Sequence, residues 1–203
     1  MGEAEISDEA VVEATGESWA HWLALLDRWG AKDRDHAEIA AYLAETHGLS
    51  PWWSQTVTVH YERIRGLREL GETAGGTFQV GVTRTLPAEE EDAWATLLGG
   101  DGLAAWLGPG APDELREGAS FRLDDETQVE VRVLKPGSHI RLFWHPPGFP
   151  KPSTLQVRVL ERKIGAAISF HHEGLPSAEM REAMRAHWRS TLETLEARVA
   201  GPR

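Results

Sequence analysis

The stretch that decides the fold is HEGLPSAEMREAMRAHWRSTLETLEARVAGPR, at residues 172–203. Pro176 ends the preceding segment, Ser177 can cap a helix, and Glu179 places negative charge where a helix N-terminus favours it. Apolar residues then recur every three or four positions, at Met180, Met184, Trp188, Leu192, Leu195 and Val199. This spacing predicts a long helix with one apolar stripe, which must cover an apolar surface elsewhere in the chain.

The segments before this helix alternate between apolar and polar residues, which predicts β-strands. In Thr77–Thr85, apolar residues begin at Phe78 and occupy every second position. Two short helices are expected next, at residues 89–98 and 99–107, and then further strands at residues 119–123, 128–134, 139–144, 154–162 and 164–171. Hairpin-length connections predict antiparallel pairing. Each strand has one apolar face, and the C-terminal helix is the only predicted element long enough to cover that face.

The first third of the chain has the pattern of a small helical unit. Three short helices are expected between Ser18 and about Arg65, where apolar residues recur with helical spacing. Asp35 and Glu38 have the spacing of a capping box. The predicted organisation is therefore a flexible tail, a small helical domain, a linker and a larger C-terminal domain, at residues 1–17, 18–66, 67–76 and 77–203.

The small helical domain is rich in tryptophan. It contains, among others, Trp19, Trp22, Trp52 and Trp53. This is more indole surface than a three-helix core of this size is expected to bury. We therefore expect this domain to dock on the C-terminal domain or on a second copy of the chain, and the second arrangement would make the protein a homodimer.

The composition excludes several classes of function. The net charge of −11 argues against binding to nucleic acids or anionic membranes, because both require a basic surface. The chain has no cysteine, which excludes disulfides, thiolate zinc sites and cysteine nucleophiles. No apolar run reaches transmembrane length and nothing resembles a signal peptide, so we expect a cytoplasmic protein without membrane insertion. No phosphate-binding loop, nucleotide signature or metal-ligand spacing is present in the sequence, so no cofactor or metal is expected.

Four stretches carry a resemblance to a known superfamily. They are FQVGVTRTLPAEEEDAWATL from Phe78, AAWLGPG from Ala104, VLKPGSHIRLFW from Val133 and HEGLPSAEMREAMRAHWRSTLETLE from His172. With them, Phe78 to about Ala200 resembles the START-like (SRPBCC, helix-grip) superfamily, in particular its branch of activator of heat-shock protein 90 ATPase homologue-like domains. The resemblance implies an α+β helix-grip (START/Bet v-like) fold, in which a curved antiparallel sheet wraps around the long C-terminal helix with an apolar cavity between them. The preceding region is similar to a small helical domain of unknown function that is often fused ahead of such domains.

The resemblance also implies a range of functions. Members of this superfamily bind lipids, sterols, polyketides or other hydrophobic molecules, and some are cyclases or hydrolases. Binding of an unidentified hydrophobic small molecule is therefore the leading hypothesis. The alternatives are an aromatase- or cyclase-type enzyme acting in the same cavity, and a protein-interaction adaptor or chaperone-cofactor-like protein. Chaperone-activator members carry an Asn-x-x-Asn-Trp-His-Trp motif that this sequence lacks, so chaperone binding is not carried over.

Bulky apolar residues of the C-terminal domain are the candidates for the cavity wall. Trp188 and Met184 lie on the apolar stripe of the long helix. Trp144 ends a strand on its apolar face, and Phe170 lies on the apolar face of the last strand. Trp106 follows the short helices, which form one rim of the cavity in the implied fold. Aromatic walls suit a planar or hydrophobic ligand, and the alternative is that these side chains pack only with one another as core.

Two polar features are candidates for chemistry. His187 lies one position, about 100°, from the apolar stripe, so it is either an acid or base at the cavity edge or a boundary residue without a catalytic role. His171 and His172, followed by Glu173, point to opposite faces of a strand, so they cannot share one metal site. One of these two histidines is expected to hydrogen-bond the sheet or cap the turn into the last helix. No catalytic residue other than the candidate His187 is assigned.

Overall fold

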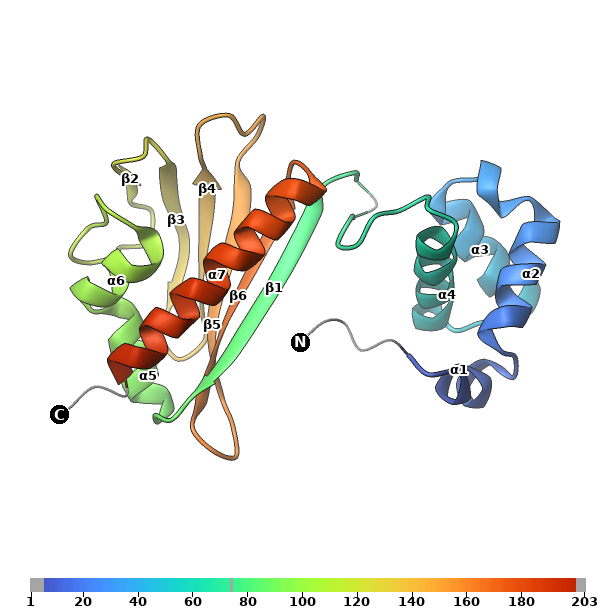
Figure 1. Cartoon of the computed structure of the whole chain (residues 1–203), viewed down its shortest axis with the longest axis horizontal. Helices are drawn as coiled ribbons and strands as arrows, with labels where there is room; N and C mark the ends of the chain where they lie inside the picture. Colours follow the sequence, from blue (N-terminus) through green and yellow to red (C-terminus); the bar gives the residue numbers. More distant parts are fainter. Residues whose placement is uncertain (1–5, 74, 200–203) are drawn as a thin grey trace. The chain divides into compact units, whose positions relative to one another are not determined.

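The structure, a computed structural model, describes residues 6–73 and 75–199. The chain divides into two compact units, Met1–Ala74 and Gly75–Arg203, and each is described by itself (Figure 1). The boundary between the units falls inside the glycine-containing segment at residues 67–76.

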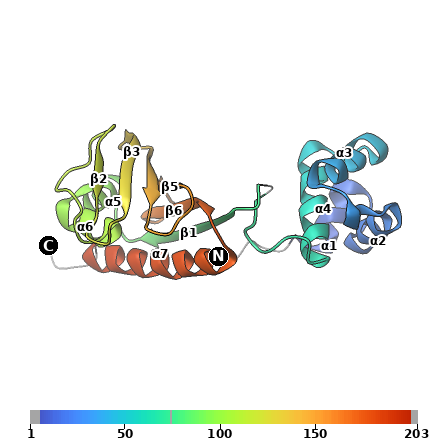
Figure 2. The ribbon, with the colours of Figure 1, turned by 90° about the horizontal axis from the view of Figure 1, so that it is seen from above.

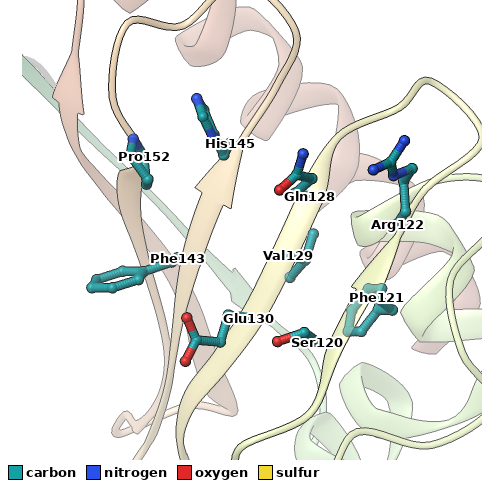
Figure 3. A pocket seen from close by; sticks show the side chains of 9 residues that line it. All are labelled: Ser120, Phe121, Arg122, Gln128, Val129, Glu130, Phe143, His145 and Pro152. Atoms are coloured by element: carbon teal, nitrogen blue, oxygen red, sulfur yellow. The ribbon is translucent and has the colours of Figure 1, made fainter.

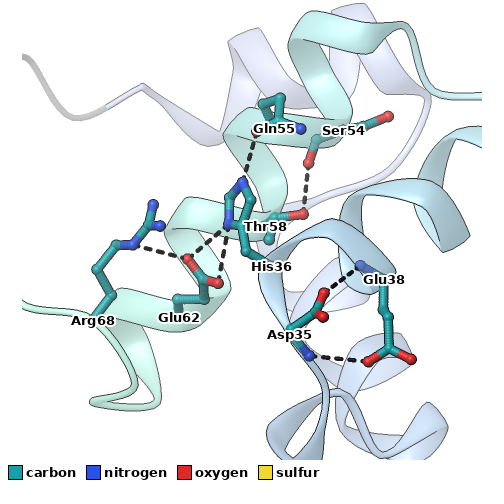
Figure 4. Close-up of polar contacts among 8 residues, drawn as sticks. All are labelled: Asp35, His36, Glu38, Ser54, Gln55, Thr58, Glu62 and Arg68. Atoms are coloured by element: carbon teal, nitrogen blue, oxygen red, sulfur yellow. Dashed lines mark hydrogen bonds and ion pairs between the residues drawn. The ribbon is translucent and has the colours of Figure 1, made fainter. Parts of the chain in front are cut away.

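The described part of the N-terminal unit is helical. Its elements are α1 (Asp8–Thr15), α2 (Trp19–Trp29), the short 3₁₀ helix η1 (Ala31–Asp33), α3 (His36–His47) and α4 (Pro51–Ile64). The first N–H groups of a helix have no partner within it, so a side-chain oxygen before the helix stabilises its start. Such caps precede all four α-helices of this unit, at Ser7, Ser18, Asp35 and Ser50. Asp35 and Glu38 form the predicted capping box, with side chain to backbone distances of 2.9 and 3.1 Å (Figure 4).

Residues 8–15 form helix α1 instead of part of the flexible tail that we predicted for residues 1–17. The helix is held because Val11 is fully buried in the core of the unit. Its ends are capped by Ser7 and by Gly16, which has the left-handed conformation that favours glycine. Trp19 Nε1 also donates to the carbonyl of Ile6 at 3.0 Å. Residues 1–5 of the predicted tail lie outside the described residues.

The N-terminal unit accommodates more indole than we expected. Trp22 is buried in its core, and Trp19, Trp29 and Trp53 pack against that core at its rim. Ring stacking covers some of these faces: the ring centroids of Trp19 and His60 are 4.0 Å apart, and those of Trp29 and Tyr42 are 3.8 Å apart. Trp52 remains 60% exposed.

A polar network with little solvent access joins α3 to α4 and the segment that follows (Figure 4). His36 Nδ1 lies 3.0 Å from a carboxylate oxygen of Glu62, and His36 Nε2 lies 2.6 Å from the side-chain oxygen of Gln55. Arg68 Nε donates to the same carboxylate at 3.1 Å. The side chains of Glu62 and Arg68 are only 9% and 10% exposed. Glu62 therefore balances the charge of a guanidinium that has little access to water.

Replacing Glu62 by Ala is expected to lower the free energy of unfolding of the N-terminal unit by about 1–3 kcal/mol, because it leaves Arg68 and His36 without their carboxylate. Hydrogen exchange on the full chain measures this effect in peptides from α3 and α4. Glu45→Ala is the matched control, since Glu45 is exposed on α3. Wild-type protection in the Glu62 variant would contradict the stabilising role of the network.

The C-terminal unit begins with strand β1 and ends with a long helix. Its elements are β1 (Phe78–Leu86), α5 (Glu90–Leu98), α6 (Gly100–Leu107), β2 (Ser120–Arg122), β3 (Gln128–Lys135), β4 (His139–His145), β5 (Ser153–Glu161), β6 (Ala166–Leu175) and α7 (Ala178–Val199). The strands pair antiparallel into one six-stranded sheet with the order β1-β6-β5-β4-β3-β2. Figure 2 shows α7 lying along one face of this curved sheet. The predicted α+β helix-grip fold is thereby confirmed.

The inner face of the sheet is the face that packs on α7 and on α5 and α6. Buried and exposed side chains alternate along β1, as the period-two pattern predicted. Helix α7 begins where we expected, with Ser177 Oγ accepting from the backbone N–H of Met180 at 3.1 Å. Trp188, Leu192 and Leu195 of its stripe are buried in the core. Among the described residues, no helix, α7 included, is both long and apolar enough to cross a membrane.

The last strand begins later than predicted, because Ile164 lies in the turn before β6 and is 84% exposed. The next residue, Gly165, has a φ of +75°, which side chains other than glycine rarely adopt. A Cβ atom at Gly165 would lie 2.1 Å from the carbonyl oxygen of Leu86. This close approach fixes the turn, so the strand starts after Gly165 and not before it.

Candidate functional site

An aromatic cluster fills the space between the sheet and α7. We define this cluster as Trp106, Trp144, Phe170, His172 and Trp188. Trp144 comes from β4, Phe170 and His172 from the inner face of β6, Trp106 from α6 and Trp188 from α7. All five side chains are buried.

Trp188 is the centre of the aromatic cluster. Its ring lies parallel to that of Phe170, with 4.8 Å between the centroids, and edge-on to Trp144 at 6.0 Å. The ring of His172 is tilted against it at 5.8 Å. On the far side of Phe170, Trp106 lies 5.9 Å away and donates its N–H to the carbonyl of Leu97 at 3.0 Å. Stacked and edge-on rings at these distances attract one another in addition to the area that they bury.

A chain of hydrogen bonds runs through the cluster from the helix to the sheet. Trp188 Nε1 donates to His172 Nδ1 at 3.3 Å. His172 Nε2 lies 2.8 Å from Ser153 Oγ, and this hydroxyl donates to the backbone carbonyl of Trp144 at 2.7 Å. Because the single hydroxyl proton goes to the carbonyl, His172 must donate from Nε2 and accept at Nδ1, as a neutral ring. Each polar side-chain atom in this series of hydrogen bonds then has a partner.

Burial keeps His172 neutral. Loss of hydration, with a smaller contribution from the charges of the neighbouring His187 and His171, lowers the pKa of His172 from 6.5 to about 3. A proton at Nδ1 would also face the N–H of Trp188. His172 therefore serves as a neutral donor and acceptor and has no free nitrogen for acid–base chemistry.

The structure places four of the five predicted cavity-lining residues in the aromatic cluster, namely Trp106, Trp144, Phe170 and Trp188. The fifth, Met184, is half-buried and packs against the same core. Four open pockets on the described residues of this unit have volumes of about 360–530 Å³. None of these four is lined by any of the five residues predicted to line the cavity. In this structure the rings fill the space between them.

His187 lies outside the aromatic cluster. Its side chain is exposed, with its ring edge-on to Trp188 at a centroid distance of 4.5 Å. Partial desolvation lowers the pKa of His187. No hydrogen bond joins it to another described residue, so this candidate acid or base has no hydrogen-bonded partner in the described part of the chain.

Ser153 is the residue of this hydrogen-bond chain that sequence reasoning missed, and His172 was recognised only as one of two alternatives. The alternation along the strands could have placed both residues on the inner face. His172 lies two positions after Phe170, and Ser153 lies two positions before the buried Leu155. Among the described residues, no group of three or more His, Asp or Glu side chains is arranged to hold a metal ion.

The fold and this interior define a START-like, helix-grip protein. A model of the family described as "Activator of Hsp90 ATPase homolog 1-like protein" matches residues 87–200, more than half of the chain. The chain belongs to this family, as its resemblance predicted. A comparison with curated protein sequences finds no match.

Solved structures share the fold at low sequence identity. CalU16 from Micromonospora echinospora is 20% identical, with a TM-score of 0.54 over 65% of this chain and 81% of that chain. CV1439 from Chromobacterium violaceum is 23% identical, with a TM-score of 0.51 over 61% of this chain and 98% of that chain. PFC0360w, an HSP90 activator from Plasmodium falciparum, is 17% identical, with a TM-score of 0.52 over 61% of this chain and 97% of that chain. At these identities the likeness supports the fold alone.

Proposed function

We propose that the C-terminal unit binds a hydrophobic small molecule between the inner face of the sheet and α7, without a catalytic step. The observation that supports this most is the buried pair of His172 and Ser153 inside an otherwise aromatic wall. Ligand sites are typically apolar, with a small number of placed polar groups that fix the orientation of the ligand. The aromatic cluster has this composition.

Entry of a ligand requires the cluster to open on the side of α7. Trp188 would have to leave its place between Phe170 and Trp144. The neighbouring helix residues Met180 and Met184 are half-buried against the core. Methionine side chains are flexible and adapt to different neighbours, so this part of α7 can repack around a ligand at low cost.

The enzymatic alternative lacks support in the cluster. An aromatase- or cyclase-type reaction needs polar groups that converge on the substrate and can take up or release a proton. When Trp188 leaves, only Nδ1 of His172 becomes free, because Nε2 stays bonded to Ser153 and Ser153 already donates to Trp144. Binding without chemistry is therefore the function that this arrangement fits best.

Native mass spectrometry of the full chain, purified from its own host, tests the proposal. The expected result is a bound small molecule, which extraction and mass analysis then identify. Adding that molecule to the apo protein should change the Trp fluorescence, because Trp106, Trp144 and Trp188 share the cluster. A mass that corresponds to the protein without a ligand, together with no fluorescence change on addition of the apolar probe N-phenylnaphthylamine, would contradict the proposal.

A further inference from the structure

The outer face of the sheet carries a groove beside the edge strand β2. A pocket of about 390 Å³ lies there, against β2, β3 and β4 (Figure 3). Strand pairing arranges its side chains in two rows across the strands. One row is Ser120, Glu130 and Phe143, and the other is Arg122, Gln128 and His145. The aromatic cluster contributes nothing to this pocket, so it is a second and separate place for a ligand.

A neighbouring pocket of about 510 Å³ extends the groove towards the β4–β5 loop. It shares Arg122, Gln128 and His145 with the first pocket, and the segment Pro146–Phe149 forms its wall. This wall is held firmly. Phe149 is anchored in the core, and its carbonyl accepts from His145 Nε2 at 3.0 Å. Prolines restrict the backbone of the loop further, so the groove is formed before a ligand arrives.

The charged side chains of the groove are already paired. Arg122 bonds Glu126 at 2.6 Å, and Glu130 bonds Arg132 at 2.6 Å. The opposite charges within each pair largely cancel, so a ligand with a net charge gains little electrostatic attraction here. The groove therefore favours a neutral ligand.

The neutral polar groups of the groove remain available. The side chains of Ser120 and Gln128 have no hydrogen bond to other described residues, and His145 uses only Nε2. Hydroxyl and amide groups can both donate and accept. Beside them, the ring of Phe143 is 37% exposed, and the guanidinium of Arg132 lies 4.7 Å from its centroid.

We propose that this outer groove binds a sugar ring. Sugar hydroxyls are neutral and both donate and accept, which matches Ser120, Gln128 and the free nitrogen of His145. The C–H face of a sugar is apolar and suits the exposed part of Phe143. The volume exceeds the lower limit of about 300 Å³ for ligand pockets, and the extension towards Pro146 leaves room for more than one ring.

Saturation-transfer NMR with the full chain tests this inference. The probes are a panel of methyl glycosides, the corresponding disaccharides and trisaccharides, and aryl glycosides. Binding with a Kd of about 1 mM is expected, as is usual for shallow and exposed sites. Tighter binding of longer oligosaccharides would point to a free glycan as the source of the sugar. Tighter binding of aryl glycosides would point to the sugar of a glycosylated small molecule.

Two groove variants and one matched control locate the binding. Gln128→Ala and Phe143→Ala are each expected to weaken sugar binding about five- to tenfold, because each removes one contact. Gln156→Ala is the control, since Gln156 lies on the same face of the sheet but on β5, outside both pockets. Thermal melting confirms that the variants are folded.

Three results would overturn the inference. They are no binding by any sugar of the panel, binding that both groove variants leave unchanged, and displacement of the sugar by acetate or methylammonium at equal concentration. Because the groove contains no residue of the aromatic cluster, these results are independent of the function proposed for the interior.

Discussion

Replacing Trp188 by Ala is expected to lower the free energy of unfolding of the C-terminal unit by about 3–5 kcal/mol, the usual cost of removing a buried indole. The side chain is fully buried, stacks on Phe170 and meets the edge of Trp144. Its removal also leaves His172 Nδ1 without its donor. Urea-dependent hydrogen exchange in peptides from β4, β5 and β6 measures the loss within the full chain.

The control for this substitution is Trp52→Ala in the N-terminal unit. Trp52 is 60% exposed, so its loss should change stability by no more than about 0.5 kcal/mol. An equal effect of the two substitutions would contradict the central position of Trp188.

Free indole should restore part of the stability of the Trp188→Ala variant. The cavity left behind has the shape of the missing ring, and engineered apolar cavities are known to bind small aromatic molecules. The gain should rise with indole concentration as expected for a ligand that binds only the folded state. The Trp52→Ala variant serves as the control, because the loss of an exposed ring leaves no buried cavity. No gain in stability of the Trp188→Ala variant with indole would contradict the prediction and show that the cluster collapses without Trp188.

Acidification should destabilise the C-terminal unit through His172. In the unfolded chain this residue takes up a proton near its usual pKa of 6.5, whereas in the folded unit burial holds its pKa at about 3. The unfolded state therefore binds more protons between these values, so stability is complete above pH 6.5 and falls as the pH decreases towards 3. At about 1.4 kcal/mol per pH unit, the loss between neutral pH and about pH 4 is about 3 kcal/mol.

Unfolding of His172→Gln as a function of pH checks this prediction. A glutamine amide can donate and accept but does not titrate, so this variant should lose stability less steeply below pH 6.5 than the wild type. His171→Gln is the control, because His171 is partly exposed and makes only the smallest of the three contributions that lower the pKa of His172, so its profile should stay close to that of the wild type. Parallel pH profiles for the wild type and His172→Gln would rule out the buried neutral histidine as the cause.

Local pattern was sufficient to predict the architecture of the C-terminal unit. The stripe from Met180 to Val199 has one periodicity, and the strand segments have another, so a helix packed on a sheet follows without long-range information. The predicted start of the last strand was wrong, because Ile164 continues the alternation of apolar and polar residues in the sequence. Only the approach of Gly165 to Leu86 in space ends the strand there.

The interior was predictable in its apolar part and less so in its polar part. Bulky aromatic residues at inward positions identified Trp144, Phe170 and Trp188. The partnership of His172 with Ser153 joins residues from two neighbouring strands, and only the pairing of Leu155 with His172 brings them together. Helix α1 was missed for a similar reason. Its one buried residue, Val11, indicates a helix only once the core of the N-terminal unit that it packs into is known.

The carbonyl of Trp144 at the end of the hydrogen-bond chain can only accept a hydrogen bond. The backbone therefore fixes the direction in which every hydrogen bond of this chain is donated. The hydroxyl of Ser153 must point towards that carbonyl, the imidazole proton must then lie on Nε2, and the lone pair of Nδ1 must face α7. A ligand that takes the place of the Trp188 indole thus meets the lone pair of Nδ1 and not a proton. Amines, phenols and alcohols can satisfy it, whereas ketones, ethers and esters of the same shape would set one lone pair against another.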